Sequence, residues 1–305
     1  MPPSRGSRVR RWRSALLFVV VATVAVAAVA ACGSGGTTPT AANSSTSRTP
    51  EFSVSTTFSL PAPDLPGQAT PTPSVRRSPT VRPSVVPLAG RTIVLDPGHN
   101  GGNAGAAEAL AREVDVGGFR QACDTVGSST DAGYAEHAFA WDLANRTAAL
   151  LRARGARVVL TRADDRGVGP CLDARAEVAN RIPADVALSL HADGGPASAR
   201  GFDVVAPGLL PGRNEAVVGP SQALARAVHS ALLSTNQPPA DRVAADGYST
   251  RIDLGGLALA RVPTVFVECA NMRNPTDAAR LTDPAYRAQL AGALAAALEE
   301  FLFGR

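Results

Sequence analysis

The stretch Arg91-Thr-Ile-Val-Leu-Asp-Pro-Gly-His-Asn-Gly-Gly102 decides the fold of this 305-residue chain. Residues 91–95 form a β-branched apolar run, which predicts a buried strand. Asp96-Pro97-Gly98 ends this run, because proline cannot extend a central ladder and glycine turns easily. His99 therefore lies at the carboxyl end of a strand, where open α/β sheets carry their active sites. On its own, His99 is compatible with a metal ligand, a general base or an ordinary loop residue.

Two further apolar runs end in chemically useful groups. Residues 186–190 precede His191, which glycines follow, and residues 262–267 precede Glu268. A carboxylate at the end of an apolar run is costly to bury unpaired, which favours a chemical role for Glu268. Two histidines together with carboxylates suit a zinc ion that keeps an open coordination position.

The predicted strands and helices alternate along the chain. The predicted strands are 91–95, 157–161, 186–190, 201–206 and 262–268, and the predicted helices are 135–154, 171–181, 220–235 and 285–303. This order predicts an α/β fold: a single three-layer domain with a mostly parallel twisted sheet flanked by helices. The candidate zinc site is expected at the carboxyl edge of the strands.

The predicted helix 135–154 offers a third ligand. Glu136 and His137 are adjacent and about 100° apart on a helix, so only one of them can face the strand ends. Glu136 falls near the middle of the apolar stripe, where a carboxylate needs a partner such as zinc. His137 falls on the flank of the stripe and is expected beside a ligand or on the surface, and His229 is expected to be structural.

The first 88 residues differ from the rest. Residues 1–13 carry five arginines and no acid, and residues 15–31 are almost continuously apolar. This layout predicts a secretory signal over 1–31, with a membrane-spanning anchor as the alternative. Val29-Ala-Ala-Cys32-Gly33 resembles a bacterial lipobox, in which Cys32 becomes the lipidated first residue. Residues 32–88 are rich in Ser, Thr and Pro and predict a disordered tether, and residues 89–305 are expected to form the catalytic domain.

The charge pattern gives no sign of a nucleic-acid partner. All 30 basic residues are arginine, and the net charge of +4 comes partly from the amino-terminal segment. Acidic and basic residues are interspersed through the rest of the chain, without a basic stripe. We expect a monomer that binds no nucleic acid.

The motifs together resemble the zinc-dependent N-acetylmuramoyl-L-alanine amidases of the type 3 family, over residues 91–303 and most closely their compact actinobacterial branch. The resemblance implies one zinc ion per chain, held by His99, Glu136 and His191, with Glu268 as the catalytic base toward a zinc-activated water. It implies peptidoglycan as the substrate, cleaved at the amide between the lactyl group of N-acetylmuramic acid and L-alanine. A zinc carboxypeptidase or endopeptidase acting on muropeptides and a non-catalytic wall-binding lipoprotein are the alternatives.

Further residues are assigned alongside the resemblance. Asp96 or Asp193 is expected to orient a ligand histidine, with turn capping as the alternative. Asn271 is expected to contact the substrate, with a structural role at a strand end as the alternative. The related enzymes also imply a disulfide between Cys123 and Cys171.

This pairing would leave Cys269 as a buried thiol and would fix the insertion 105–134 beside the site. With the amino-terminal motifs, the chain is expected to be exported. We expect a lipid on Cys32 to anchor it to the outer face of the cytoplasmic membrane, with secretion as the alternative.

Overall fold

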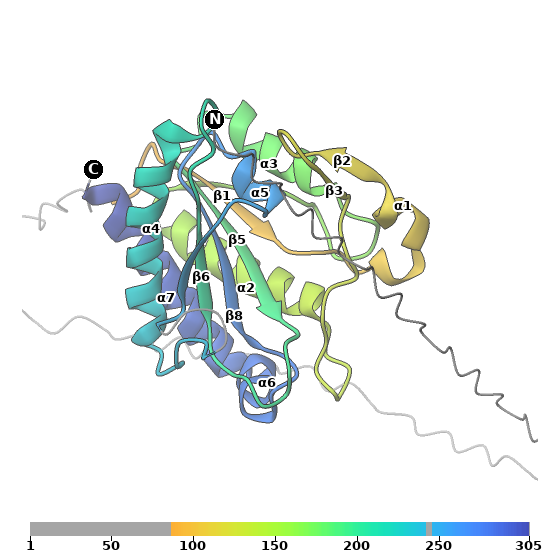
Figure 1. Cartoon of the computed structure of the whole chain (residues 1–305). Coiled ribbons are helices and arrows are strands. Elements are labelled where there is room, and N and C mark those ends of the chain that lie inside the picture. Colours follow the sequence, from red (N-terminus) through yellow and green to blue (C-terminus); the bar gives the residue numbers. More distant parts are fainter. Residues whose placement is uncertain (1–86, 242–245, 305) are drawn as a thin grey trace, which may run out of the picture. The chain divides into compact units, whose positions relative to one another are not determined.

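The computed structural model describes residues 87–241 and 246–304 (Figure 1). The predicted signal segment, Cys32 and nearly all of the predicted tether lie outside these residues. Within the described ranges, no helix has the length and apolar character needed to cross a membrane.

A six-stranded sheet forms the centre of the domain, in the spatial order β4-β1-β5-β8-β6-β7. Its strands are β1 (Thr92–Pro97), β4 (Arg157–Leu160), β5 (Val186–Asp193), β6 (Asp203–Pro207), β7 (Tyr248–Arg251) and β8 (Thr264–Asn271). Strands β4, β1, β5 and β8 are parallel to one another, whereas β6 is antiparallel to β8 and β7 is parallel to β6. The predicted α/β class with a mostly parallel sheet is confirmed, and the reversed pair at one edge was not predicted.

Helices cover both faces of the sheet. They are α1 (Ala107–Ala111), α2 (Glu136–Ala153), α3 (Leu172–Arg181), α4 (Glu215–Leu233), α5 (Gly255–Ala258), α6 (Pro275–Thr282) and α7 (Pro284–Phe303), with a 3-10 turn η1 (Asn103–Gly105). Helix α7 packs against α2 and α4, and α3 packs against α5. The layers are therefore α2, α4 and α7 on one face of the sheet and α3 and α5 on the other.

Along each strand, successive side chains point alternately to the two faces of the sheet. In β1, Ile93 and Leu95 belong to the large core beneath α2, α4 and α7, whereas Val94 packs with Ala179 of α3 and Ala187 of β5. Successive side chains of a strand point to opposite faces, so Asp96 shares the α3 face with Val94. The carboxyl ends of β1 and β5 thus present their polar side chains toward α3 and α5.

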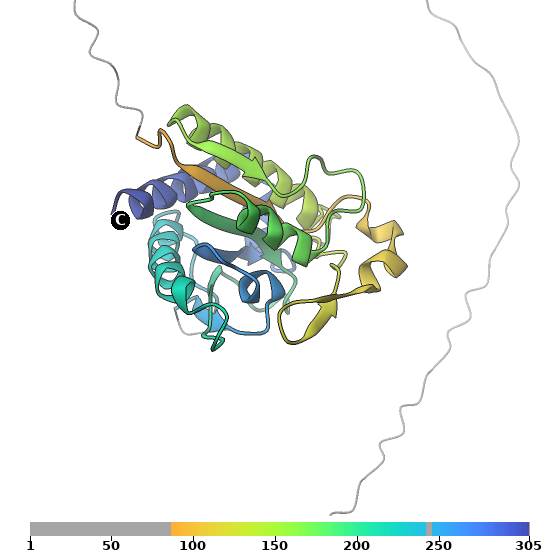
Figure 2. The ribbon, with the colours of Figure 1, turned by 90° about the horizontal axis from the view of Figure 1, so that it is seen from above.

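Several short elements carry no periodic pattern and were not predicted from the sequence. A hairpin of β2 (Glu113–Asp115) and β3 (Arg120–Ala122) occupies the insertion 105–134. Figures 1 and 2 both show it on the opposite side of the domain from α4 and α7. Helix α4 begins at Glu215, five residues earlier than predicted. Pro220 therefore lies inside the helix and not in the first turn, where proline is best tolerated.

Candidate active site

His99 follows β1 directly and is held in an uncommon backbone conformation. Its φ of 56° lies in the left-handed region, which non-glycine residues seldom adopt outside functional or tight sites. The preceding Gly98 allows the close approach, since a Cβ there would lie 2.2 Å from Cε1 of His191. The sequence Pro97-Gly98 therefore lets two histidines from neighbouring strands share one small space.

Glu136 is the first residue of α2 and lies between these histidines. Its Oε1 is 3.1 Å from Nε2 of His99 and 2.9 Å from Nδ1 of His191. The backbone N–H groups of Ser128 and Ala192 donate to its two oxygens, and the carboxylate is buried. The ligand atoms of His99, Glu136 and His191 all lie within 4.8 Å of one another.

The protonation of this cluster shows what it is suited to hold. Burial disfavours a charged imidazole, but hydrogen bonds to Asp124 and Glu136 raise the pKa of His99 to about 10. Burial disfavours the carboxylate as well, yet hydrogen bonds from His191 and His99 bring the pKa of Glu136 well below its usual range. A buried carboxylate between two imidazoles thus needs positive charge beside it. Two imidazole nitrogens and one carboxylate oxygen fit a zinc ion, which would supply that positive charge.

Glu268 lies one strand away from this cluster. In the parallel pairing of β5 with β8 it is the register partner of His191. Phe266, two residues earlier on the same face, stacks on the ring of His191 with centroids 4.3 Å apart. Glu268, Phe266 and the three clustered residues line one cavity of about 700 Å³ beneath α3 and α5.

The two remaining described histidines lie outside the cluster. His137 points to Asp165, whose Oδ2 is 2.8 Å from its Nδ1. His229 places Nε2 against the backbone oxygen of Asp246 and its ring against Phe202. Helix α2 thus places Glu136, and not His137, beside His99 and His191, and His229 has structural contacts.

Asp96 differs from the expectation that it orients a ligand histidine. Its carboxylate accepts hydrogen bonds from Thr161, Ser189 and Arg175, so it joins β1 to β5 and α3. The carboxylate outside the cluster that contacts one of its histidines is instead that of Asp124, at 3.0 Å from Nδ1 of His99. Asp193 lines the cavity and accepts from the backbone N–H of the next residue, which matches the turn-capping alternative.

Asn271 is placed for structure rather than for substrate contact. The side chain is fully buried, and its Nδ2 donates to the backbone oxygens of Pro196 and Ala199. Its Oδ1 accepts from the backbone N–H of Arg273, so every polar atom of the side chain is used within the protein. These contacts fit the alternative of a strand-end structural role, and the contact of Asn271 with the substrate stays a prediction.

The comparison with known proteins identifies the family. Residues 93–300 match the N-acetylmuramoyl-L-alanine amidase family. The chain belongs to this family. It is 41% identical over 218 residues to the N-acetylmuramoyl-L-alanine amidase Rv3717 of Mycobacterium tuberculosis, covering 70% of this chain and 88% of that protein.

Solved structures of amidases have the same fold as this chain. The crystal structure of the amidase Ami1 from Mycobacterium smegmatis superposes with a TM-score of 0.68 at 40% identity, over 72% of this chain and 99% of that one. Ami1 from Mycobacterium abscessus gives a TM-score of 0.66 at 39% identity, over 70% of this chain and all of that one. The described domain thus has the fold of these amidases over its whole length.

Two residues that contact His99 in this amidase, Asp124 and Gly127, were not found from the sequence, although the disulfide beside them was predicted. The predicted disulfide between Cys123 and Cys171 is present, and Cys269 is a buried free thiol. The disulfide is followed directly by Asp124, which contacts His99. Gly127 packs against the ring of His99, since a Cβ there would lie 2.7 Å from its Cδ2. Because Asp124 directly follows Cys123, the predicted disulfide was the sequence feature that pointed to this side of the site.

Proposed function

We propose that this amidase hydrolyses the amide bond between the lactyl group of N-acetylmuramic acid and L-alanine of the peptidoglycan stem peptide, using one zinc ion held by His99, Glu136 and His191. The observation that supports it most strongly is the convergence of these three ligand atoms within 4.8 Å in a buried site. Membership of the amidase family supports the choice of bond.

Glu268 is the proton carrier in this proposal. A zinc ion in the site would supply a Lewis acid that polarises the lactyl carbonyl and lowers the pKa of water. Glu268 accepts a proton from the attacking water as its oxygen bonds to the carbonyl carbon. The carbon–nitrogen bond then breaks, and Glu268 returns that proton to the departing L-alanine nitrogen. The products are a free lactyl carboxylate on the glycan and a stem peptide with a free amino group.

The test is mass spectrometry of a peptidoglycan digest. We expect intact stem peptides that begin with a free L-alanine amine, together with glycan that has lost its peptides. A chelator should abolish these products and added zinc should restore them. Shortened stems still joined to the glycan would indicate a carboxypeptidase or endopeptidase instead. No product from a folded, zinc-loaded protein would indicate a wall-binding lipoprotein without turnover.

The place of action is part of the same proposal. Export and a lipid on Cys32 rest on the arginine-rich start, the apolar run and the lipobox in the sequence. Cys32→Ser should abolish lipid attachment, which mass spectrometry of the mature protein from membranes detects. A wild-type mature form that is cleaved elsewhere and carries no lipid would contradict the anchor and favour secretion.

A further inference from the structure

The inference concerns the nitrogen of His99 that faces away from the candidate zinc site. Three oxygens surround its Nδ1: Oδ1 of Asp124 at 3.0 Å, the backbone oxygen of Thr125 at 3.1 Å and Oγ1 of Thr125 at 3.3 Å. A carboxylate and a carbonyl oxygen only accept hydrogen bonds, so Nδ1 must carry a proton. The lone pair of the neutral ring is then on Nε2, which faces Glu136.

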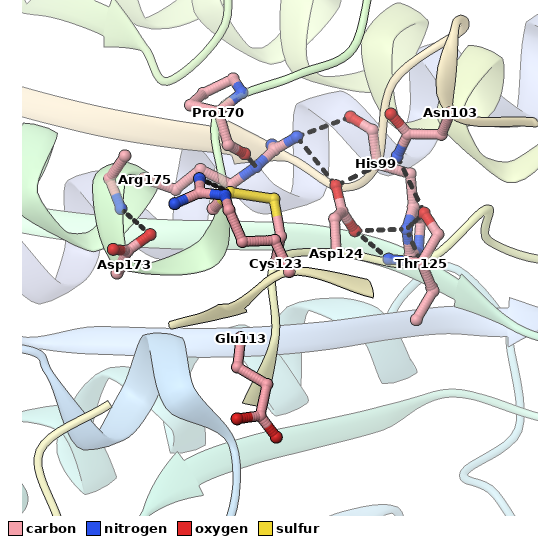
Figure 3. The surroundings of a disulfide bond; sticks show 12 residues. His99, Asn103, Glu113, Cys123, Asp124, Thr125, Pro170, Asp173 and Arg175 are labelled. Carbon is pink, nitrogen blue, oxygen red and sulfur yellow. Dashed lines mark hydrogen bonds and ion pairs between the residues drawn. A yellow bond between two sulfur atoms is a disulfide. The ribbon is translucent and has the colours of Figure 1, made fainter. Parts of the chain in front are cut away.

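The second carboxylate oxygen of Asp124, which does not contact His99, is held by other residues. Its Oδ2 accepts from Nδ2 of Asn103 at 3.2 Å and lies 3.4 Å from Nη2 of Arg175. The same Nη2 donates to the backbone oxygen of His99 at 2.8 Å, and Nη1 donates to Pro97. Arg175 is nearly inaccessible, so one buried guanidinium fixes both Asp124 and the left-handed backbone of His99. Figure 3 shows Asp124 between Arg175 and His99.

The disulfide joins the two segments that make these contacts. Cys123 directly precedes Asp124, and Cys171 is the N-cap of α3, the helix that carries Arg175. Backbone hydrogen bonds run alongside it, from Leu172 N–H to the Cys123 oxygen and from Arg175 N–H to the Cys171 oxygen, both 2.9 Å long. The insertion loop that carries Asp124 thus has a covalent attachment one residue from the carboxylate.

We propose that Asp124, fixed by the Cys123–Cys171 disulfide and Arg175, is the positioning residue that holds His99 in the tautomer and orientation for binding zinc. This rests on the zinc site of the proposed function. Carboxylates on the far nitrogen of a ligand histidine typically contribute 10- to 100-fold in metal affinity. The disulfide then serves the metal site as well as stability.

The chain provides a matched control. Asp165 contacts Nδ1 of His137 at 2.8 Å, and His137 directly follows the proposed ligand Glu136. This second aspartate–histidine pair is partly buried like the first but lies outside the ligand cluster. Removing its carboxylate therefore tests whether any aspartate–histidine pair near α2 affects metal binding.

The experiment measures zinc affinity by competition with a chromogenic chelator for folded full-length proteins. Asp124→Ala should bind zinc about 10- to 100-fold more weakly than wild type. Asp124→Asn, which keeps an acceptor but loses the charge, should fall between them, and Asp165→Asn should match wild type. The visible spectrum of cobalt-substituted protein should change in Asp124→Ala and stay the same in Asp165→Asn, which a purely structural role of Asp124 would not produce.

The disulfide is tested in the same assay. The double variant Cys123→Ala/Cys171→Ala should lose affinity, and adding Asp124→Ala to it should cost less than in wild type, because the two changes act on one unit. Circular dichroism verifies that each variant is folded. Wild-type affinity in folded Asp124→Ala, with affinity lost in His99→Ala, would overturn the inference and leave the zinc site intact. Wild-type protein that binds no zinc, or His99→Ala that binds it normally, would instead contradict the proposed function.

Discussion

The two faces of the central sheet are packed in different ways. Toward α2, α4 and α7, large side chains such as Phe139, Leu143 and Leu188 are fully buried in one continuous core. Toward α3 and α5, the buried apolar cluster is small, consisting of Val94, Ala179 and Ala187, and it borders the cavity of about 700 Å³. Since each strand contributes alternate residues to both faces, the same few strands serve both purposes.

The face toward α2, α4 and α7 contributes mainly to stability, and the face toward α3 and α5 carries the groups suited to chemistry. Dense packing of large apolar groups supplies most of the hydrophobic stabilisation of a domain, and the first face provides it. The second face keeps open space and carries polar groups such as Asp96, Ser189 and Glu268 on the same strands. Substitutions on the two faces should therefore affect different properties.

The largest expected effect is at Glu268. It lies on the sheet face toward α3 and α5 that borders the cavity, the cavity face. Glu268→Gln keeps the volume but cannot accept the proton, so turnover should fall by about 10²- to 10⁴-fold. Zinc content and the unfolding midpoint should stay close to wild type. Atomic spectroscopy of the purified variant, beside turnover of a muramoyl-peptide substrate, measures both. A variant that lost its zinc would show that Glu268 is a ligand and not the base.

On the opposite face, Leu95→Ala should act on stability. The side chain is fully buried in the large core, so its removal leaves a cavity among closely packed neighbours. The free energy of unfolding should fall by about 2–5 kcal/mol. Denaturant titration measures this, and the loss should be nearly the same at pH 5 and pH 7 because the contacts are apolar. A change below about 1 kcal/mol would show that this face is not the tightly packed one.

The contribution of Asp96, on the cavity face, to the free energy of unfolding should depend on pH. Burial disfavours the Asp96 carboxylate, but Arg175 and the hydroxyls of Thr161 and Ser189 bring its pKa down to about 2. A pKa below the unfolded value gives stability that is present at neutral pH and lost as the pH falls from about 5 to 2. The gain is on the order of 2 kcal/mol. Metal-free wild type should exceed Asp96→Asn by this amount at pH 7, and the difference should shrink steadily in acid. A constant difference would contradict this account.

Much of the fold could be predicted because its long elements carry their own signals. The apolar runs before His99, His191 and Glu268 identified β1, β5 and β8, and helical periodicity identified α2 and α7. The hairpin, β7 and α5 have three or four residues per element, too few for a periodic pattern. The direction of β6 also escaped prediction, because antiparallel pairing depends on the path of the chain between strands.

The site was predictable where a residue lies on a regular element. Glu136 could be distinguished from His137 because helical geometry allows only one of two neighbours to face the sheet. Asp124 could not be found in this way, since its contact with His99 depends on a loop that is positioned by a disulfide and Arg175. The contacts of Asn271 could not be predicted either, because its partners are backbone oxygens of a loop whose path the sequence does not reveal.

The smallest expected effects come from Val94, the neighbour of Leu95 on the same strand. Val94 is buried but borders the cavity, so part of its surface has few packing partners. Val94→Ala should cost about 1 kcal/mol, less per carbon atom removed than Leu95→Ala, because little new empty space is created.

Enlarging side chains should also cost more on the densely packed face than on the face that borders the cavity. Val94→Ile adds a methylene that can extend into the cavity, so the free energy of unfolding should stay within about 0.5 kcal/mol of wild type. Val267→Ile places the same methylene in the dense core of the opposite face, where the residue is fully buried. Overpacking there should cost about 1–3 kcal/mol. Because both changes convert valine to isoleucine in central strands, strand propensity and the unfolded chain are matched, and denaturant titration reports the packing of the two faces alone. Equal losses for the two variants would mean that the cavity face is packed as tightly as the core.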